Sequence, residues 1–290
     1  MTYHLALAGN ASLKELDLGS NLLQGAGVAT VVGALPGPAP LEVLNLSFCA
    51  LRADGADALA AYLARTNCTL TSLRVDGCEL GPDGAAAIAG AIEAKKLGVG
   101  LKTLRLECNA IGEGGAAALG RALAGNTDMR ALYLGCNELG QSEACAQSLA
   151  EGLSMNATLR TLDLGDNLIR EAGVRAVLEG VRAQQTLTAL DLSSCAIGDG
   201  GAEAVARELE ANGALRFARV ASNEIGADGG RALADAVDAS PCETLLLDVT
   251  QNPRVAYSDL VRVRLSNCAR AAAAGPNPLD GAGRADPYVS

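Results

Sequence analysis

The eleven residues from Leu101 to Ile111, LKTLRLECNAI, contain the pattern that decides the fold. Leucines occupy its first, fourth and sixth positions, asparagine its ninth and isoleucine its eleventh. The pattern, written L-x-x-L-x-L-x-x-(N/C)-x-(L/I), recurs every 28 to 31 residues. Its full copies begin at Leu13, Leu41, Leu70, Leu101, Met129, Leu159, Leu187 and Leu215, and a degenerate ninth copy begins at Thr244. A period of this length predicts a solenoid of stacked supersecondary units.

Each repeat combines a strand with a helix. Leu104-Arg105-Leu106 alternates apolar and polar residues, which is the period of a half-buried strand. Leu119, Ala122 and Leu123 follow the i, i+3, i+4 spacing of a helix with one buried face. Strands sit roughly 4.8 Å apart, whereas packed helices need roughly 8 to 10 Å. The stack must therefore curve, with a parallel sheet on its concave face and helices on its convex face.

Glycine and asparagine recur at fixed places in the repeat. A glycine ahead of the helical stripe in every full repeat but the fifth, such as Gly115, is expected to let the chain turn tightly into the helix and the helix lie close to the strand layer. Asparagines three residues before a repeat start are expected to end the helices in a left-handed conformation; they are Asn10, Asn67, Asn126, Asn156 and Asn212. Three of the four N-x-S/T sequons, at Asn10, Asn67 and Asn156, follow from this helix-stop signal, and Asn45 opens the fourth.

The ninth position of the pattern carries either an amide or a thiol. Its residues are Asn21, Cys49, Cys78, Asn109, Asn137, Asn167, Cys195, Asn223 and Asn252. A buried amide there can donate to and accept from backbone groups of adjacent layers, and cysteine can take its place as a small residue with a weak donor. These residues are therefore predicted to be structural.

With the Asn/Cys alternation and a G-A-x-x-L-A-x-A-L helix, residues 13 to about 255 resemble the leucine-rich repeat proteins of the ribonuclease-inhibitor-like type. That group includes ribonuclease inhibitor, the repeat domains of NOD-like receptors and Ran GTPase-activating protein. The resemblance implies a right-handed α/β horseshoe, an α/β leucine-rich-repeat solenoid that holds a protein ligand on its concave face.

The repeat register divides the chain into four parts. Residues 1–12 are the end of a preceding repeat or an N-terminal cap helix, and we favour the first, which would make the chain a piece of a longer array. Residues 13–255 hold the repeats, with eight full copies and one degenerate copy. Residues 256–270 form a candidate closing helix, and residues 271–290, rich in Ala, Gly and Pro, are expected to be a disordered tail. Two extra residues after Leu139 should make the fifth strand-to-helix loop bulge, and residues 95–100 should lengthen the third helix-to-strand return.

The concave face is given by the residues that flank the strand leucines. The fifth position of the pattern supplies Asp17, Asn45, Arg74, Arg105, Tyr133, Asp163, Asp191, Arg219 and Asp248. Asp76 and Glu107 join the centre from the seventh position, and both phenylalanines of the chain, Phe48 and Phe217, flank strands as exposed aromatics. Arginine and tyrosine are enriched among interface hot spots, which favours a protein-binding patch. The alternative is a ladder of charges that pair across strands and keep the face soluble. As partner-binding candidates we take Arg74, Asp76, Arg105, Glu107, Tyr133, Asp163, Asp191, Arg219, Phe48 and Phe217.

The composition of the chain disfavours some classes of binding partner. The net charge of −10 disfavours nucleic acid and anionic lipid. No apolar stretch is long enough for a transmembrane helix, and the N-terminus lacks a signal peptide. Nine cysteines, an odd number without dense spacing, indicate reduced thiols in the cytoplasm, with the nucleus as the alternative. Cys108 and Cys136 occupy adjacent layers roughly 5 Å apart, which leaves a disulfide or shared metal geometrically open.

Catalytic motifs are missing. His4 is the only histidine, and no phosphate-binding loop, zinc motif or CxxC pair occurs. The sequence thus predicts a non-enzymatic interaction module without a catalytic site, cofactor or metal. We expect it to be the sensing or scaffolding part of a larger protein. A GTPase activator resembling the Ran-directed family, with a small GTPase as partner, is the alternative, although residues 271–290 hold only Asp280 and Asp286 in place of that family's acidic segment. An enzyme with a site on the rim is a third, remote hypothesis.

Overall fold

The structure is a computed structural model that describes residues 7, 10–35, 40–94 and 100–279. Within these residues the strands form one parallel sheet in which each strand pairs with its sequence neighbours, from β1 at one edge to β9 at the other. The strands are β1 (Glu15–Asp17), β2 (Val43–Asn45), β3 (Ser72–Arg74), β4 (Thr103–Arg105), β5 (Ala131–Tyr133), β6 (Thr161–Asp163), β7 (Ala189–Asp191), β8 (Phe217–Arg219) and β9 (Leu246–Asp248).

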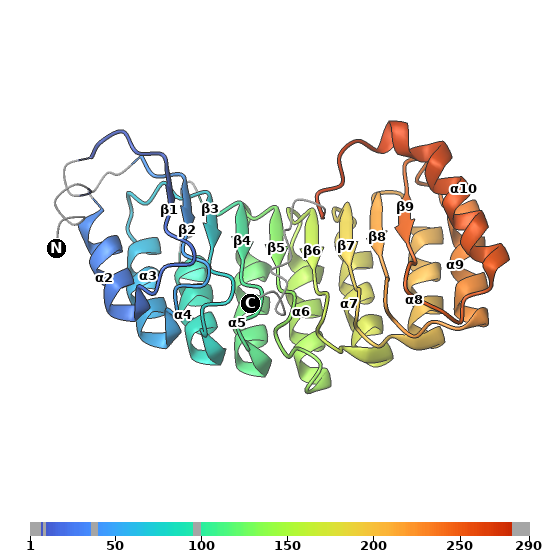
Figure 1. Cartoon of the computed structure of the whole chain (residues 1–290), viewed down its shortest axis with the longest axis horizontal. Coiled ribbons are helices and arrows are strands. Elements are labelled where there is room, and N and C mark those ends of the chain that lie inside the picture. The colour runs from blue at the N-terminus through green and yellow to red at the C-terminus, as the bar shows by residue number, and fades with distance from the viewer. Residues whose placement is uncertain (1–6, 8–9, 36–39, 95–99, 280–290) are drawn as a thin grey trace.

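A helix follows each strand and packs beside the helix of the next repeat. The helices are α2 (Gln24–Ala34), α3 (Arg52–Leu63), α4 (Gly81–Ala94), α5 (Gly112–Gly125), α6 (Glu143–Met155), α7 (Arg170–Gln184), α8 (Gly198–Ala211), α9 (Ala227–Ala239) and α10 (Tyr257–Ala274). Figure 1 shows the strands in one row and the helices in a second row beside it. The expected α/β solenoid, with the sheet on the concave face and the helices on the convex face, is confirmed.

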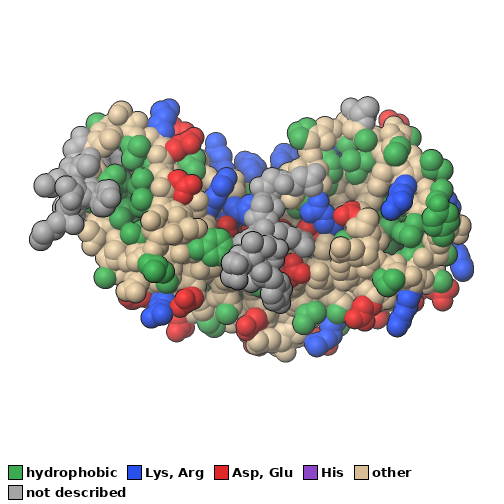
Figure 2. All heavy atoms as spheres, in the orientation of Figure 1, with side chains coloured by type: hydrophobic (Ala, Val, Ile, Leu, Met, Phe, Trp, Pro, Cys, Tyr) green, Lys and Arg blue, Asp and Glu red, His purple; other side chains and the backbone are tan. Residues whose placement is uncertain are grey.

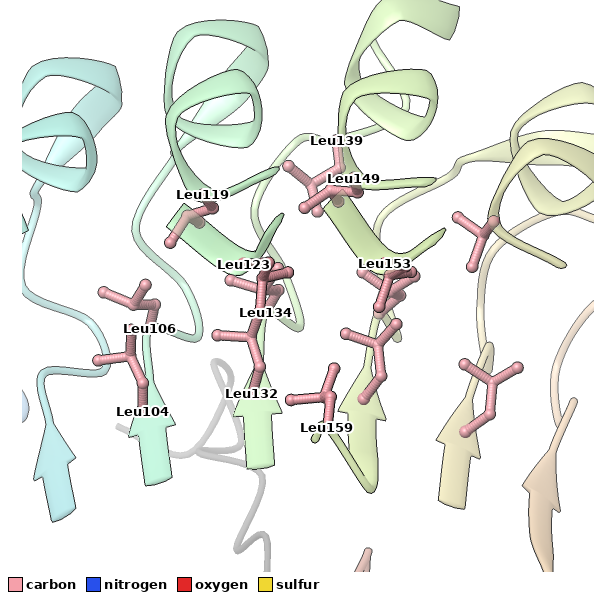
Figure 3. Packing of buried hydrophobic residues seen from close by; sticks show 14 of the residues in the cluster. Leu104, Leu106, Leu119, Leu123, Leu132, Leu134, Leu139, Leu149, Leu153 and Leu159 are labelled. Atoms are coloured by element: carbon pink, nitrogen blue, oxygen red, sulfur yellow. The ribbon is translucent and has the colours of Figure 1, made fainter. Parts of the chain in front are cut away.

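The core is a continuous layer of aliphatic side chains between the sheet and the helices. In the fourth repeat, Leu104 and Leu106 point from the strand layer toward Leu119 and Leu123 of α5, and the next repeats copy this arrangement (Figure 3). These leucines are almost completely buried. Because each layer is filled by the same residue types, the core extends along the array rather than around one centre.

The ninth-position asparagines form a hydrogen-bonded ladder through the turns that follow the strands. The Asn137 amide donates to the carbonyls of Leu106, Leu134 and Gly135, and its oxygen accepts from the backbone N–H of Asn109. Cysteine at the same position keeps part of this pattern, since the thiol of Cys195 donates to the carbonyl of Leu164 at 3.2 Å. The predicted structural role is confirmed for the buried members of this series, whereas Asn21 is exposed.

The asparagines after the helices end them by a different mechanism from the one expected. Asn126, Asn156 and Asn212 are C-caps, but their backbones are extended rather than left-handed. The Asn126 side chain accepts from the N–H groups of Asp128 and Met129, which turns the chain into the next strand. The left-handed cap predicted here was wrong because the side chain, not the backbone, makes the turn. Asn67 is not a C-cap, because α3 ends at Leu63 and Ala64 caps it.

The recurring glycines also act differently from the expectation, and Gly115 lies inside α5 rather than before it. A Cβ on Gly115 would lie 2.0 Å from Ile111 Cγ2 and 2.9 Å from the Cβ of Ala85 in the preceding helix. The glycine therefore permits close approach of helix to helix and of the helix to its own turn, rather than of helix to strand layer.

The fifth repeat contains the lengthened loop, Glu138–Ser142, between β5 and α6. Gly140 lies against the backbone of the next loop, where an added Cβ would come within 2.0 Å of the carbonyl oxygen of Leu168. The long return expected in the third repeat involves residues 95–99, which lie outside the described residues, as does most of the expected N-terminal segment 1–12.

The C-terminal part differs in extent from the sequence-based boundaries. Helix α10 continues through Ala274, four residues beyond the expected end at 270. Residues 275–279 then lie against the sheet, where Leu279 is only 2% exposed. An apolar contact with the concave face explains why this stretch is ordered against the sheet, and residues 280–290 lie outside the described part of the chain.

Candidate concave-face site

The parallel register places the fifth-position residues in one row across the concave face. Asn45 lies beside Arg74, Arg74 beside Arg105, and Arg105 beside Tyr133. Asp163, Asp191, Arg219 and Asp248 continue the row. Figure 2 shows acidic and basic side chains along the hollow between the two arms of the molecule. The structure thus brings together the polar side chains that the repeat register predicted.

A buried ionic cluster occupies the centre of this row. The Arg105 guanidinium pairs with Asp76, with 3.2 Å between Nε and Oδ2, and with Glu107 on the same edge of the sheet. It also lies over the Tyr133 ring, 4.8 Å from the ring centre. All four side chains are buried. The sequence placed these residues on the open face, but mutual pairing and stacking cover them.

Burial changes the protonation equilibria of this cluster. Loss of solvent raises the pKa of Glu107 to about 7, an effect that Arg105 opposes and Asp76 reinforces. Burial alone would lower the pKa of Arg105, but the Asp76 and Glu107 carboxylates outweigh it and raise that pKa. Burial also raises the pKa of Tyr133, against the influence of Arg105. Near neutral pH the cluster therefore contains a carboxyl group that exchanges its proton.

A second ionic group lies in the C-terminal half of the row. Arg219 bridges Asp191 and Asp248, at 3.2 and 3.4 Å. Asp191 also accepts from the N–H of Ser193 at 2.8 Å, and Asp163 accepts from the N–H of Gly165 at 2.9 Å. Both aspartates are almost fully buried. These carboxylates therefore stabilise the turns that follow the strands, and Asp191 also compensates the charge of Arg219.

The two phenylalanines occupy different environments. Phe48 is 43% exposed and lies over Gly77, where an added Cβ would clash with the ring at 2.4 Å. Phe217 is only 5% exposed, because Ala274 and Leu279 pack against it. The expectation that both aromatics are exposed was wrong for Phe217, since the end of α10 and the segment after it cover that ring.

Arg74 is exposed in the same half of the face as Phe48. Among the predicted site residues these two are the most accessible, while the others are buried or half-buried by ion pairs and packing. Sequence reasoning missed three residues at the C-terminal end of the face. Arg216 binds the end of α10, and Pro278 and Leu279 contact the sheet. The signal that could have found this contact was a leucine, Leu279, in a stretch otherwise read as a tail.

The cysteines show no metal-binding arrangement. None of the nine cysteines is in a disulfide, and six of them are buried. Burial, together with neighbouring Cys136, raises the pKa of Cys108 to about 12, so this thiol stays protonated at neutral pH. Among the described residues, no group of histidine, cysteine and acidic side chains could hold a metal ion. No helix in that part of the chain is long and apolar enough to cross a membrane.

Comparison with known proteins supports the repeat assignment. A family model described as a leucine-rich repeat matches residues 9–32, 38–60, 66–89, 101–120, 156–178, 183–206 and 219–234, together more than half of the chain. The chain belongs to the leucine-rich repeat family. No curated protein sequence matches it. Among solved structures, this leucine-rich repeat chain is similar to one described as the crystal structure of the Rad7 and Elc1 complex in yeast. The two share 17% identity over 92% of this chain and 80% of the other, with a TM-score of 0.41.

Proposed function

We propose that this leucine-rich repeat chain is a non-enzymatic interaction module that binds a protein ligand on its concave face. Leucine-rich repeat proteins are generally interaction modules, which supports the general class. One observation supports this choice of surface. Two accessible side chains, Phe48 and Arg74, lie on the same face as the buried ion pairs of Arg105. Aromatic and arginine side chains presented on a preorganised surface are typical of binding hot spots.

The buried cluster contributes to this surface through rigidity. Arg105 is fixed by two carboxylates and one ring, so it has little freedom to reach a partner. Changing Arg105 and Tyr133 together would leave the Asp76 and Glu107 carboxylates unpaired and would test folding as much as binding. The accessible pair is therefore the better probe of the binding surface.

The test compares Phe48→Ala/Arg74→Glu with a matched double variant on the convex side, Met155→Ala/Arg121→Glu. Met155 and Arg121 are exposed on helices α6 and α5. Each protein serves as bait in its own cell lysate, and the captured proteins are identified by mass spectrometry. We expect the concave variant to lose partners that the wild type and the convex variant both retain. The concave-face proposal fails if all three baits capture the same proteins while their circular dichroism spectra agree.

Several finer statements remain part of this proposal. We assign the ribonuclease-inhibitor-like subtype on the alternation of Asn and Cys at the ninth position, and the domain boundaries at residues 12 and 255 on the repeat register. A cytoplasmic or nuclear setting is supported by the abundance of buried thiols. No observation favours the GTPase-activating alternative, which stays a prediction that GTP hydrolysis assays with a panel of small GTPases would test.

A further inference from the structure

The chain turns back toward the sheet where α10 ends. Gly275, with a φ of +75°, follows the last helical residue and breaks the helix. The Arg216 guanidinium donates to the carbonyls of Ala273 and Ala274, at 3.3 and 2.5 Å, and so satisfies two acceptors at the helix end. Figure 1 shows the chain leaving α10 and running back toward β7 and β6.

The segment after this turn, residues 275–279, contacts the concave face at two points. Leu279 packs with Ala189, Phe217 and Leu246, which come from β7, β8 and β9. The hydroxyl of Tyr133 in β5 donates to the carbonyl of Pro278 at 3.4 Å. One short segment therefore reaches across strands β5 to β9.

The segment has a defined local shape. The Asn277 side chain accepts from the N–H of Leu279 at 3.0 Å, which closes a turn around Pro278 and presents the leucine to the sheet. Proline fixes its own φ and has no N–H to satisfy, so this turn costs little conformational entropy to order. Asn-Pro-Leu is thus a compact unit for delivering one leucine side chain.

A pocket of about 350 Å³ lies beside the seated leucine. Its walls are strands β8 and β9, the inner side of α10 with Leu260 and Val263, and the segment itself through Asn277 and Leu279. The segment thus closes one side of an apolar pocket on the binding face, and its departure would widen that pocket.

We infer that Ala189, Phe217 and Leu246 form a leucine-recognition site on the concave face, which Leu279 occupies in cis and an Asn-Pro-Leu turn of a partner protein occupies in trans. The inference rests on the proposed function, because it names the chemistry of the partner that the concave face binds. The cis segment is a competitor: it is tethered five residues from the anchored end of α10, so its effective concentration at the site is high.

A partner that displaces the cis segment must replace its contacts with the sheet. These contacts include the packing of Leu279 in the apolar site and one long hydrogen bond, which the carbonyl of Pro278 accepts from Tyr133. A partner that adds contacts to Phe48 and Arg74, in the other half of the face, would bind two regions at once and so outcompete the tethered leucine.

The experiment measures binding of a fluorescein-labelled peptide, Gly-Pro-Asn-Pro-Leu, to the full-length chain by fluorescence polarisation. The proteins compared are wild type, Leu279→Ala, and the matched control Leu265→Ala, whose side chain is exposed on α10. Because Leu279→Ala vacates the site, we expect it to bind the peptide about fivefold or more tightly than the wild type. Leu265→Ala should match the wild type, and a peptide ending in Ala should bind none of them.

A second variant keeps the result interpretable. Adding Phe217→Ala to Leu279→Ala should abolish the gain in peptide affinity while circular dichroism shows an unchanged fold. Equal peptide affinity for wild type and Leu279→Ala, or no binding by either folded protein, overturns the leucine-recognition site. Such a result leaves the capture experiment with Phe48 and Arg74 untouched, whereas identical capture lists would refute the proposed function without bearing on the peptide measurement.

Discussion

Replacing Asn137 by Ala tests how much the asparagine ladder stabilises the array. The side chain is completely buried and makes four hydrogen bonds. Its three acceptor carbonyls keep other donors: Asn109 at Leu106, Asn167 at Leu134, and the N–H of Cys108 at Gly135. The backbone N–H of Asn109 has Asn137 as its acceptor, so the variant leaves that donor buried without a partner.

The magnitude follows from these contacts. An orphaned buried donor costs about 1 to 3 kcal/mol, and each other lost hydrogen bond about 1 kcal/mol. We therefore expect Asn137→Ala to lower the free energy of unfolding by about 4 to 6 kcal/mol. Asn21→Ala is the matched control, because Asn21 is exposed and donates only to Leu18 and Gly19; its cost should stay below about 1 kcal/mol.

The loss in free energy of unfolding caused by Asn137→Cys should lie between the losses caused by Asn137→Ala and Asn21→Ala. Cys195 shows that a thiol at this position still donates to a carbonyl of the preceding layer. The assay is equilibrium urea unfolding followed by circular dichroism at 222 nm. Losses of equal size for Asn137→Ala and Asn21→Ala would refute the view that the ladder acts through its buried position.

Two further predictions concern the ionic cluster and the fifth-repeat loop. Burial raises the pKa of Glu107 from 4.5 to about 7, so the folded state binds this proton more tightly than the unfolded state. The resulting stabilisation is fully present below pH 4.5 and is lost as the pH rises to 7; at about 1.4 kcal/mol per pH unit it amounts to about 3 kcal/mol. Glu107→Gln should therefore flatten the fall in stability between pH 5 and 8 measured by urea unfolding, and parallel curves for variant and wild type would contradict the raised pKa. Gly140→Ala should lower the thermal midpoint, because the new Cβ would clash with the carbonyl of Leu168. The control is Gly90→Ala, at an exposed position of α4 with open space around it, which should raise stability by about 0.5 to 1 kcal/mol. Equal effects of the two variants on the midpoint would show that the loop adapts.

The regular part of the fold could be predicted from the sequence because one local pattern repeats. Leu104 and Leu106 are fixed by the alternation of a strand, and Asn137 by its place in the turn. The parallel pairing of Arg74 with Arg105 follows once the repeats are aligned. Each of these features depends only on the neighbouring repeat, which is why a single sequence contains enough information for them.

Accessibility on the concave face could not be predicted in the same way. Whether Arg105 faces solvent depends on how its side chain pairs with Asp76 and Glu107, which no spacing reveals. Phe217 is covered by Leu279, which lies more than sixty residues away in a stretch without periodicity. Asn126, Asn156 and Asn212 end their helices as predicted, whereas α3 ends before Asn67. The extended backbone at Asn126 depends on side-chain geometry.

The hydrogen bond between Tyr133 and Pro278 joins residues 145 positions apart, whereas the ladder contacts of the sheet join residues about one repeat apart. In an array whose repeats contact only their neighbours, each interface between repeats can open under force independently of the others. The contact between Tyr133 and Pro278 joins the fifth repeat to the segment after α10, so the C-terminal half should resist extension as one unit. The N-terminal half should extend more easily. A pulling experiment would meet two stiffnesses in one molecule, and release of Leu279 would make them equal.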